Sequence, residues 1–113
     1  MFTKEQLADF VARTFGAPYA RLNCWQVPQL FYRENGVDLP DDYYAALASF
    51  VVVDRPEPGD VIAIRNHPFV TNHCGLYVGD DIFLHSLETT GVATGNVTRR
   101  PWTERIAGFL RLK

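Results

Sequence analysis

Hydrophobic residues near the start of the chain recur at intervals of three and four, as they do along one face of a helix. The stripe consists of Leu7, Phe10, Val11 and Phe15. Thr3 followed by Gln6 has the form of a capping box, and Gly16 is a residue that often ends helices. The pattern predicts a first helix between Thr3 and Gly16 with one buried stripe.

A second helical segment follows a loop over residues 16–22. Its inward positions are Val27, Leu30 and Phe31. Asn23 can cap this helix and Gly36 can end it, which puts Cys24 at the helix N-terminus. Pro28 lacks a backbone N–H and its ring clashes with the carbonyl four residues back, that of Cys24. We therefore expect the helix to start late or to bend.

Farther along the chain the hydrophobic period changes from helical to strand-like. Asp41 and Asp42 favour the positive end of a third helix over residues 43–49. Runs typical of strands then occupy residues 61–65, 74–78, 82–87 and 106–112, separated by turn residues. Helices first and strands afterwards predict an α+β fold, with N-terminal helices packed on one antiparallel sheet.

Length and composition limit the classes of protein to which the chain can belong. The 113 residues are 47% hydrophobic, which predicts one domain over residues 1–113 with a single core. The formal net charge of -2, without a basic stripe, argues against a nucleic-acid partner. The N-terminus lacks the apolar core of a signal peptide, and no stretch approaches the roughly 20 apolar residues of a membrane span.

Two cysteines are the candidate thiols of the chain. A helix N-terminus favours the thiolate, so Cys24 is a candidate nucleophile, although a free cysteine is often only a small buried apolar residue. Cys74 lies inside an apolar strand and is expected to point away from any site. A disulfide between the two is not expected, because the apolar content suffices for a core and nothing marks the chain as secreted.

A predicted hairpin brings two histidines together. His73 begins a strand, from which its ring can reach a cleft and act as a base toward Cys24. A three-residue loop over residues 79–81 puts Val78 opposite Ile82 and places His73 diagonally from His85.

In this register Gly75 faces His85 and leaves room for an imidazole. His85 would then accept a hydrogen bond from one nitrogen of His73 and leave the other nitrogen for Cys24. His67, before a proline in a polar loop, is expected to be an exposed turn residue outside the site.

Four stretches carry a resemblance to a known family. They are Gly16-Ala17-Pro18-Tyr19, Asn23-Cys24-Trp25, Pro58-Gly59-Asp60-Val61, and His73-Cys74-Gly75-Leu76-Tyr77-Val78-Gly79 followed by Leu84-His85. In this order and at these separations they resemble the NlpC-like family of papain-like cell-wall cysteine peptidases. The resemblance covers nearly the whole chain and is closest to members associated with phage tails.

The resemblance implies a role for each of five residues. Cys24 would be the nucleophile, His73 the base and His85 the third, polar member, with Tyr19 and Trp25 as substrate- or oxyanion-binding positions. The implied reaction is hydrolysis of peptidoglycan stem peptides, typically between D-glutamate and a diamino acid, without metal or cofactor.

The phage-tail resemblance and the lack of an export signal predict a virion or tail-like particle as the location, with other particle proteins as partners. Two departures from the family pattern are Pro28 and Gln26, which replaces a small glycine and is expected to narrow the space beside the thiol. Three alternatives therefore stay open: an inactive structural tail component, a thiol amidase or acyltransferase on another substrate, and a metal site at Cys24, His73 and His85.

Overall fold

A computed structural model describes residues 2–66 and 71–113, so His67 lies outside the described residues. The helices are α1 (Lys4–Thr14), α2 (Gln26–Glu34), α3 (Tyr43–Ala46), the 3-10 helix η1 (Leu47–Ser49) and α4 (Trp102–Arg105). The strands are β1 (Phe50–Val53), β2 (Val61–Ile64), β3 (His73–Gly79), β4 (Ile82–Leu87), β5 (Gly91–Asn96) and β6 (Ile106–Leu112). None of the described helices is long and apolar enough to cross a bilayer.

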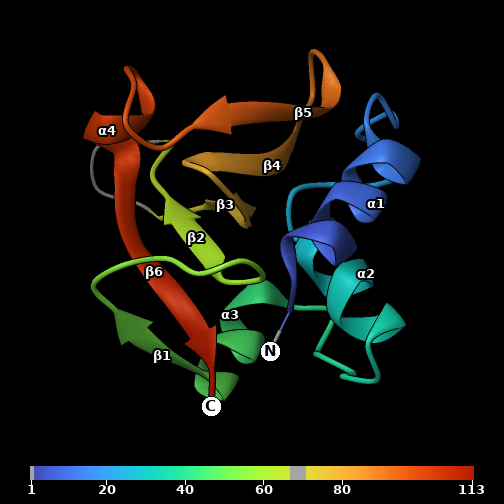
Figure 1. Ribbon diagram of the computed structural model, residues 1–113, viewed down its shortest axis with the longest axis vertical. Coiled ribbons are helices and arrows are strands. Elements are labelled where there is room, and N and C mark those ends of the chain that lie inside the picture. Colours follow the sequence, from blue (N-terminus) through green and yellow to red (C-terminus); the bar gives the residue numbers. More distant parts are fainter. Residues whose placement is uncertain (1, 67–70) are drawn as a thin grey trace.

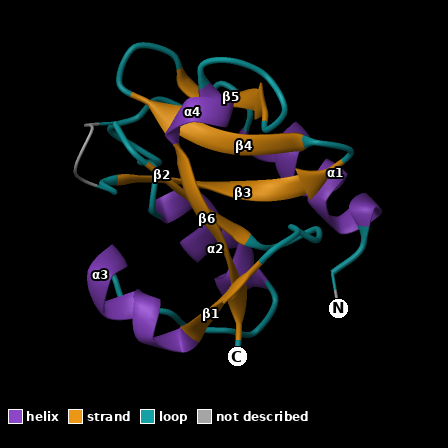
Figure 2. Ribbon diagram, turned by 90° about the vertical axis from the view of Figure 1, so that its left-hand side faces the viewer, coloured by secondary structure: helices purple, strands orange, loops and turns teal. Residues whose placement is uncertain are grey.

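The strands form one sheet in the order β1-β6-β2-β3-β4-β5, and every neighbouring pair is antiparallel. Helices α1 and α2 cover one face of this sheet, whereas α4 lies against the opposite face (Figures 1 and 2). The expected α+β architecture, with N-terminal helices on an antiparallel sheet, is confirmed.

Each face of the sheet has its own hydrophobic cluster. The larger cluster joins the helices to the sheet and includes Cys74 and Leu76 of β3. The smaller cluster, on the α4 side, contains Tyr77 and Phe83, with Trp102 packed against it. Because successive side chains of a strand point to opposite faces, β3 contributes to both clusters.

The start of α1 is the predicted capping box. Gln6 N donates to Thr3 Oγ1 at 3.1 Å, and Thr3 N donates to Gln6 Oε1 at 2.8 Å. Leu7 and Phe10 are fully buried. The prediction for Phe15 was wrong, because this residue follows the helix and its side chain is 60% exposed.

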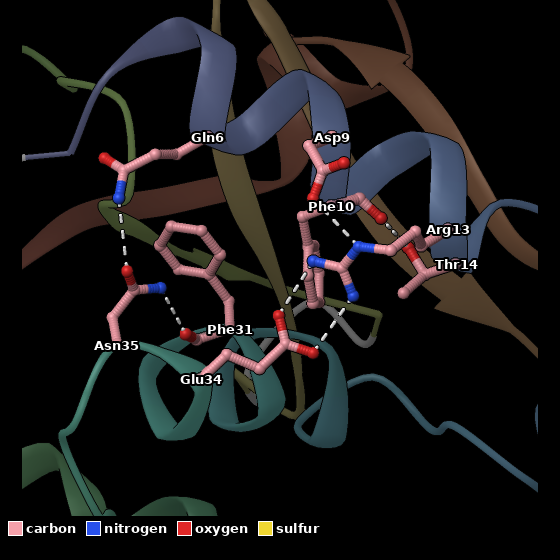
Figure 3. Close-up of polar contacts among 8 residues, drawn as sticks. All are labelled: Gln6, Asp9, Phe10, Arg13, Thr14, Phe31, Glu34 and Asn35. Carbon is pink, nitrogen blue, oxygen red and sulfur yellow. Dashed lines mark hydrogen bonds and ion pairs between the residues drawn. The ribbon is translucent and has the colours of Figure 1, made fainter.

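Polar contacts hold α1 against α2, the helix that follows Cys24 (Figure 3). The guanidinium of Arg13 donates to both carboxylate oxygens of Glu34, at 3.1 and 2.9 Å. Nearer the start of α1, Gln6 Nε2 donates to Asn35 Oδ1 at 3.2 Å. These contacts sit above the buried Phe10 and Phe31 rings, whose centroids are 5.3 Å apart. The two helices therefore form one layer over the sheet.

The turn before β2 ties α2 to both ends of the sheet. The Tyr32 hydroxyl donates to Gly59 O. Asp60, 4% exposed, accepts two hydrogen bonds from Arg111 of β6, at 2.8 and 3.1 Å, and one from Glu57 N at 2.7 Å. A buried carboxylate needs such partners. The Pro58-Gly59-Asp60-Val61 stretch is therefore a structural anchor.

The third helix spans the predicted residues 43–49, with its last turn as the 3-10 helix η1. Three elements were not predicted: β1, β5 and α4. β5 contains two glycines and an asparagine, which are poor strand formers, and it exists because it pairs along the whole of β4. The very short α4 follows Pro101 and carries no hydrophobic repeat long enough to detect.

The β3–β4 hairpin has the predicted register but a different turn. Leu76 pairs with Leu84, as expected, whereas Gly79 instead of Val78 faces Ile82. The turn consists of two residues, Asp80 and Asp81, both with positive φ, and a bulge before Gly79 absorbs the difference. The expected three-residue loop was therefore wrong, while the alignment of the two histidines was preserved.

Candidate active site

A second capping box fixes the start of α2 beside Cys24. Gln26 N donates to Asn23 Oδ1 at 3.0 Å, and Asn23 N donates to Gln26 Oε1 at 2.9 Å. Val27 N donates to Asn23 O at 3.2 Å, the first helical hydrogen bond. Cys24 therefore lies in the first turn, where unpaired N–H groups and the helix dipole favour an anion.

Gln26 occupies a different place from the one expected. Its side chain folds back onto Asn23 and lines a cavity of about 470 Å³ between α1 and α2, together with Arg13 and Gln29. It does not line the cleft that contains Cys24. The prediction that Gln26 narrows the space beside the thiol was therefore wrong.

Pro28 explains the position of the second cysteine. In an unbroken helix the N–H of residue 28 would bond to the carbonyl of residue 24, but proline has no N–H. Cys74 Sγ donates to Cys24 O at 3.3 Å instead. Cys74 lies on the helix-covered face, opposite to His73, but it contacts Cys24. The expectation that it points away from the site was therefore wrong.

The two histidines of the hairpin are in direct contact. His73 Nε2 and His85 Nδ1 are 2.9 Å apart, and the side chains are 3% and 1% exposed. Gly75 lies between them on β3, and a Cβ there would come within 2.8 Å of the Phe83 ring and 3.5 Å of His85 Cβ. The space at Gly75 therefore serves Phe83 first.

Aromatic rings enclose His85. Its ring centroid lies 4.7 Å from that of Phe83 and 4.8 Å from that of Trp102, which meets it edge-on at 89°. Burial, and then the nearby charge of His73, lower the pKa of His85 to about 4. A neutral His85 leaves Nδ1 free to accept a hydrogen bond from His73 Nε2–H, so His73 Nδ1 is available to a thiol.

The Cys24 thiol is strongly acidified. A hydrogen bond from Cys74, and then a hydrogen bond and the positive charge of His73, lower its pKa to about 4 despite the opposing effect of burial. Tyr19 lies close to the same sulfur, because burial and then the Cys24 charge raise the pKa of its phenol. Cys24 is therefore a thiolate at neutral pH.

These side chains open onto a cleft of about 370 Å³. The residues that line it are Tyr19, Cys24, Asn66, Asn72, His73, Ser86, Leu87, Glu88 and Thr89. Trp25 is absent from this lining, since its indole is 5% exposed and donates from Nε1 to Pro40 O at 2.9 Å. Only the backbone of Trp25 is left to serve a substrate.

The sequence did not single out several of these cleft residues. Ser86 is 1% exposed, and its hydroxyl has no hydrogen-bond partner within residues 2–66 and 71–113. Ser86 and Asn72 directly adjoin the two histidines, His85 and His73. That adjacency was the available signal, whereas the contribution of Glu88 depends on the fold of the β4–β5 connection.

The arrangement agrees with comparisons to known proteins. A sequence model of the NlpC/P60 family matches residues 13–111. The fold is similar to that of an NlpC/P60 family protein from Bacillus cereus, with a TM-score of 0.83, 21% identity and 98% of this chain covered. This chain spans 40% of that protein's length. No curated protein sequence matches the chain.

Two peptidoglycan hydrolases also have this fold. The NlpC/P60 domain of SagA has a TM-score of 0.71 and 16% identity, with 99% of each chain covered. RipB from Mycobacterium tuberculosis has the same TM-score and identity, with 97% of this chain and 65% of RipB covered. The fold is therefore α+β and papain-like, and, since the family match extends over most of its length, the chain belongs to the NlpC/P60 family.

Proposed function

We propose that the protein is a cysteine endopeptidase that hydrolyses peptidoglycan stem peptides, with Cys24, His73 and His85 as its catalytic triad. The observation that carries this proposal is the 2.9 Å contact between His73 Nε2 and His85 Nδ1, beside an acidified Cys24 in an open cleft. A nucleophile, a base and a group that orients the base are the parts that thiol hydrolysis needs.

The proposed reaction begins with attack of the Cys24 thiolate on the carbonyl carbon of the scissile amide. N–H groups in the first turn of α2, with the Tyr19 hydroxyl beside the sulfur, supply donors for the oxyanion of the tetrahedral intermediate. His73 then donates its Nδ1 proton to the leaving amine, and the C–N bond breaks. The products of this step are a free amine and an acyl-enzyme on Cys24.

Water completes the turnover. His73 takes a proton from a water molecule, whose oxygen attacks the thioester carbonyl, and the Cys24 thiolate leaves. His85 stays neutral throughout, because the charged form is disfavoured in its buried position. Its role is to hold the His73 ring in one tautomer and one orientation.

The choice of substrate rests on the family. Relatives with this fold include proteins described as peptidoglycan hydrolases, SagA and RipB. We propose the amide between D-glutamate and the diamino acid as the bond cleaved, which is the bond implied by the sequence resemblance.

The open cleft favours an enzyme over a purely structural tail component. A structural component that has lost catalysis would tolerate a closed cleft, or a thiol separated from its base. Here Cys24 and His73 line the same cleft of about 370 Å³, and His73 acidifies the thiol.

The test is incubation of the protein and its Cys24→Ala variant with peptidoglycan stem peptides, followed by mass analysis of the fragments. We expect the wild-type protein to release a fragment ending in D-glutamate and the variant to release none. Thermal unfolding of both proteins establishes that the variant is folded. Equal cleavage by the two proteins would refute the thiol mechanism, and cleavage elsewhere in the stem would move the assigned bond.

We also propose that the protein is carried by a phage tail or tail-like particle, with other particle proteins as its partners. The support is the sequence resemblance to tail-associated members of the family. Mass spectrometry of purified particles from a producing strain tests this location. Detection of the chain in stoichiometric amount supports it, whereas absence from intact particles that contain the other tail proteins contradicts it.

A further inference from the structure

The contact between Cys24 and Cys74 combines two chemically different thiols. We propose that the pair is a reversible oxidation site, in which a peroxide oxidises Cys24 and Cys74 then closes an intramolecular disulfide with it. This inference concerns modification of the thiols and holds whether or not the protein cleaves peptidoglycan.

Three features of the fold hold the two thiols together. Pro28 leaves the Cys24 carbonyl without its helical donor, and Cys74 Sγ fills that position at 3.3 Å. The side chains of the two cysteines are also hydrogen-bonded to each other. Both cysteines are free in the structure. Rotation of the side chains about their Cα–Cβ bonds is then the movement needed to join the sulfurs.

The two thiols differ in access and in charge. Cys24 is half-buried and lines the open cleft, so a small peroxide can reach it, whereas Cys74 is 1% exposed. Cys24 is also the thiolate, with its pKa lowered to about 4, while burial raises the pKa of Cys74. A thiolate with access to solvent beside a second thiol is the arrangement of reversible redox sensors.

The proposed chemistry has two steps. In the first, the Cys24 thiolate attacks one oxygen of hydrogen peroxide, the O–O bond breaks, and Cys24 sulfenic acid and hydroxide form. In the second, the Cys74 sulfur attacks the Cys24 sulfur and the S–O bond breaks. The departing hydroxide takes the Cys74 proton and leaves as water. The two cysteines lose two electrons, which the peroxide accepts.

The first step prepares the second. Besides burial, a hydrogen bond to Cys24 and the charge of Cys24 raise the pKa of the Cys74 thiol. Both of these effects depend on the Cys24 thiolate, and sulfenic acid is neutral. Oxidation of Cys24 therefore removes the charge that kept the Cys74 proton in place, and Cys74 becomes a better nucleophile only after Cys24 has been oxidised.

Intact-mass analysis after treatment with a small excess of hydrogen peroxide tests the site, and Cys74→Ser is the matched variant because it keeps a hydroxyl donor in place of the thiol. We expect the wild-type protein to lose about 2 Da and both alkylatable thiols, and dithiothreitol to restore them. Cys74→Ser should instead gain about 32 Da as Cys24 sulfinic acid, which dithiothreitol does not reverse.

Two results would overturn the inference. One is sulfinic acid formation in the wild-type protein as fast as in Cys74→Ser, and the other is a disulfide between two copies of the chain in place of the internal one. Thermal unfolding of Cys74→Ser establishes that it is folded. None of these readouts needs peptidase activity, so failure of the proposed oxidation is distinguishable from failure of the proposed hydrolysis.

Discussion

The two faces of the sheet surround their functional groups in different ways. On the helix-covered face, Cys24 contacts polar groups and borders an open cleft. On the α4 face, His85 is 1% exposed, and the rings of Phe83 and Trp102 enclose it. Both environments lower a pKa to about 4, but by opposite physical means.

For the thiol, hydrogen bonds and the charge of His73 stabilise the ionised form against the opposing effect of burial. For the imidazole, burial destabilises the ionised form. His73 joins the two environments, because it contacts His85 and acidifies Cys24. The comparison teaches that the reactive group is controlled by its donors and the orienting group by its enclosure.

Removal of the His73 partner should have the largest effect on activity. In His85→Leu the His73 Nε2 proton loses its acceptor, so we expect kcat for stem-peptide cleavage to fall by about 10²–10⁴-fold with little change in KM. His85→Asn, which offers an amide oxygen in the same region, should retain more of the activity. Wild-type kcat in His85→Leu would show that enclosure of His85 serves only packing.

Opening the aromatic enclosure should mainly reduce stability. Trp102→Ala removes a half-buried ring from the smaller cluster, so we expect a loss of about 2–3 kcal/mol in the free energy of unfolding in urea. Solvent then reaches His85 and raises its pKa toward 6.5, which NMR titration of the imidazole measures.

The control for Trp102→Ala is Tyr44→Ala, at a side chain that is 56% exposed, with an expected change within about 0.5 kcal/mol. An unchanged His85 titration in Trp102→Ala would mean that burial by this ring does not set the pKa of His85.

Changing the donor to the thiol should shift a titration instead. The thiolate is the form that reacts with iodoacetamide, so the alkylation rate of wild-type Cys24 should fall as the pH drops through about 4. Cys74→Val removes the hydrogen bond that contributes most to this low pKa, and the midpoint should move to higher pH. Cys74→Ser keeps a donor and should shift the midpoint less. Identical midpoints in all three proteins would exclude Cys74 as the acidifying group.

The smallest effect is expected at the cap of α2. Gln26→Ala removes half of the capping box with Asn23, and should reduce the free energy of unfolding by about 0.5–1 kcal/mol without raising kcat. Thr3→Ala at the matching box of α1 should cost a similar amount. An increase in kcat for Gln26→Ala would restore the idea that this side chain obstructs the cleft.

The elements predicted from the sequence are those whose signal is local. The caps at Thr3 and Asn23, the helical stripes and the strand runs 61–65, 74–78 and 82–87 all correspond to observed elements. The hairpin register was predictable because side chains alternate along strands, and it brought His73 beside His85 despite a different turn.

The parts that the sequence did not predict depend on contacts distant in the chain. Strand β5 is defined by its pairing with β4, and Cys74 meets Cys24 across 50 positions of sequence. Gln26 was misinterpreted because its neighbours were compared with a family pattern before its own capping geometry was considered. Such contacts follow from tertiary packing, which a single sequence does not display.

The β3–β4 hairpin has a consequence for folding. His73 and His85 are 12 positions apart, so their contact can form as soon as one short hairpin closes. The thiol reaches them only when the N-terminal helices dock from far away along the chain, which is the slower kind of event. During refolding, the appearance of a reactive Cys24 thiolate should therefore report this docking step and lag behind formation of the hairpin.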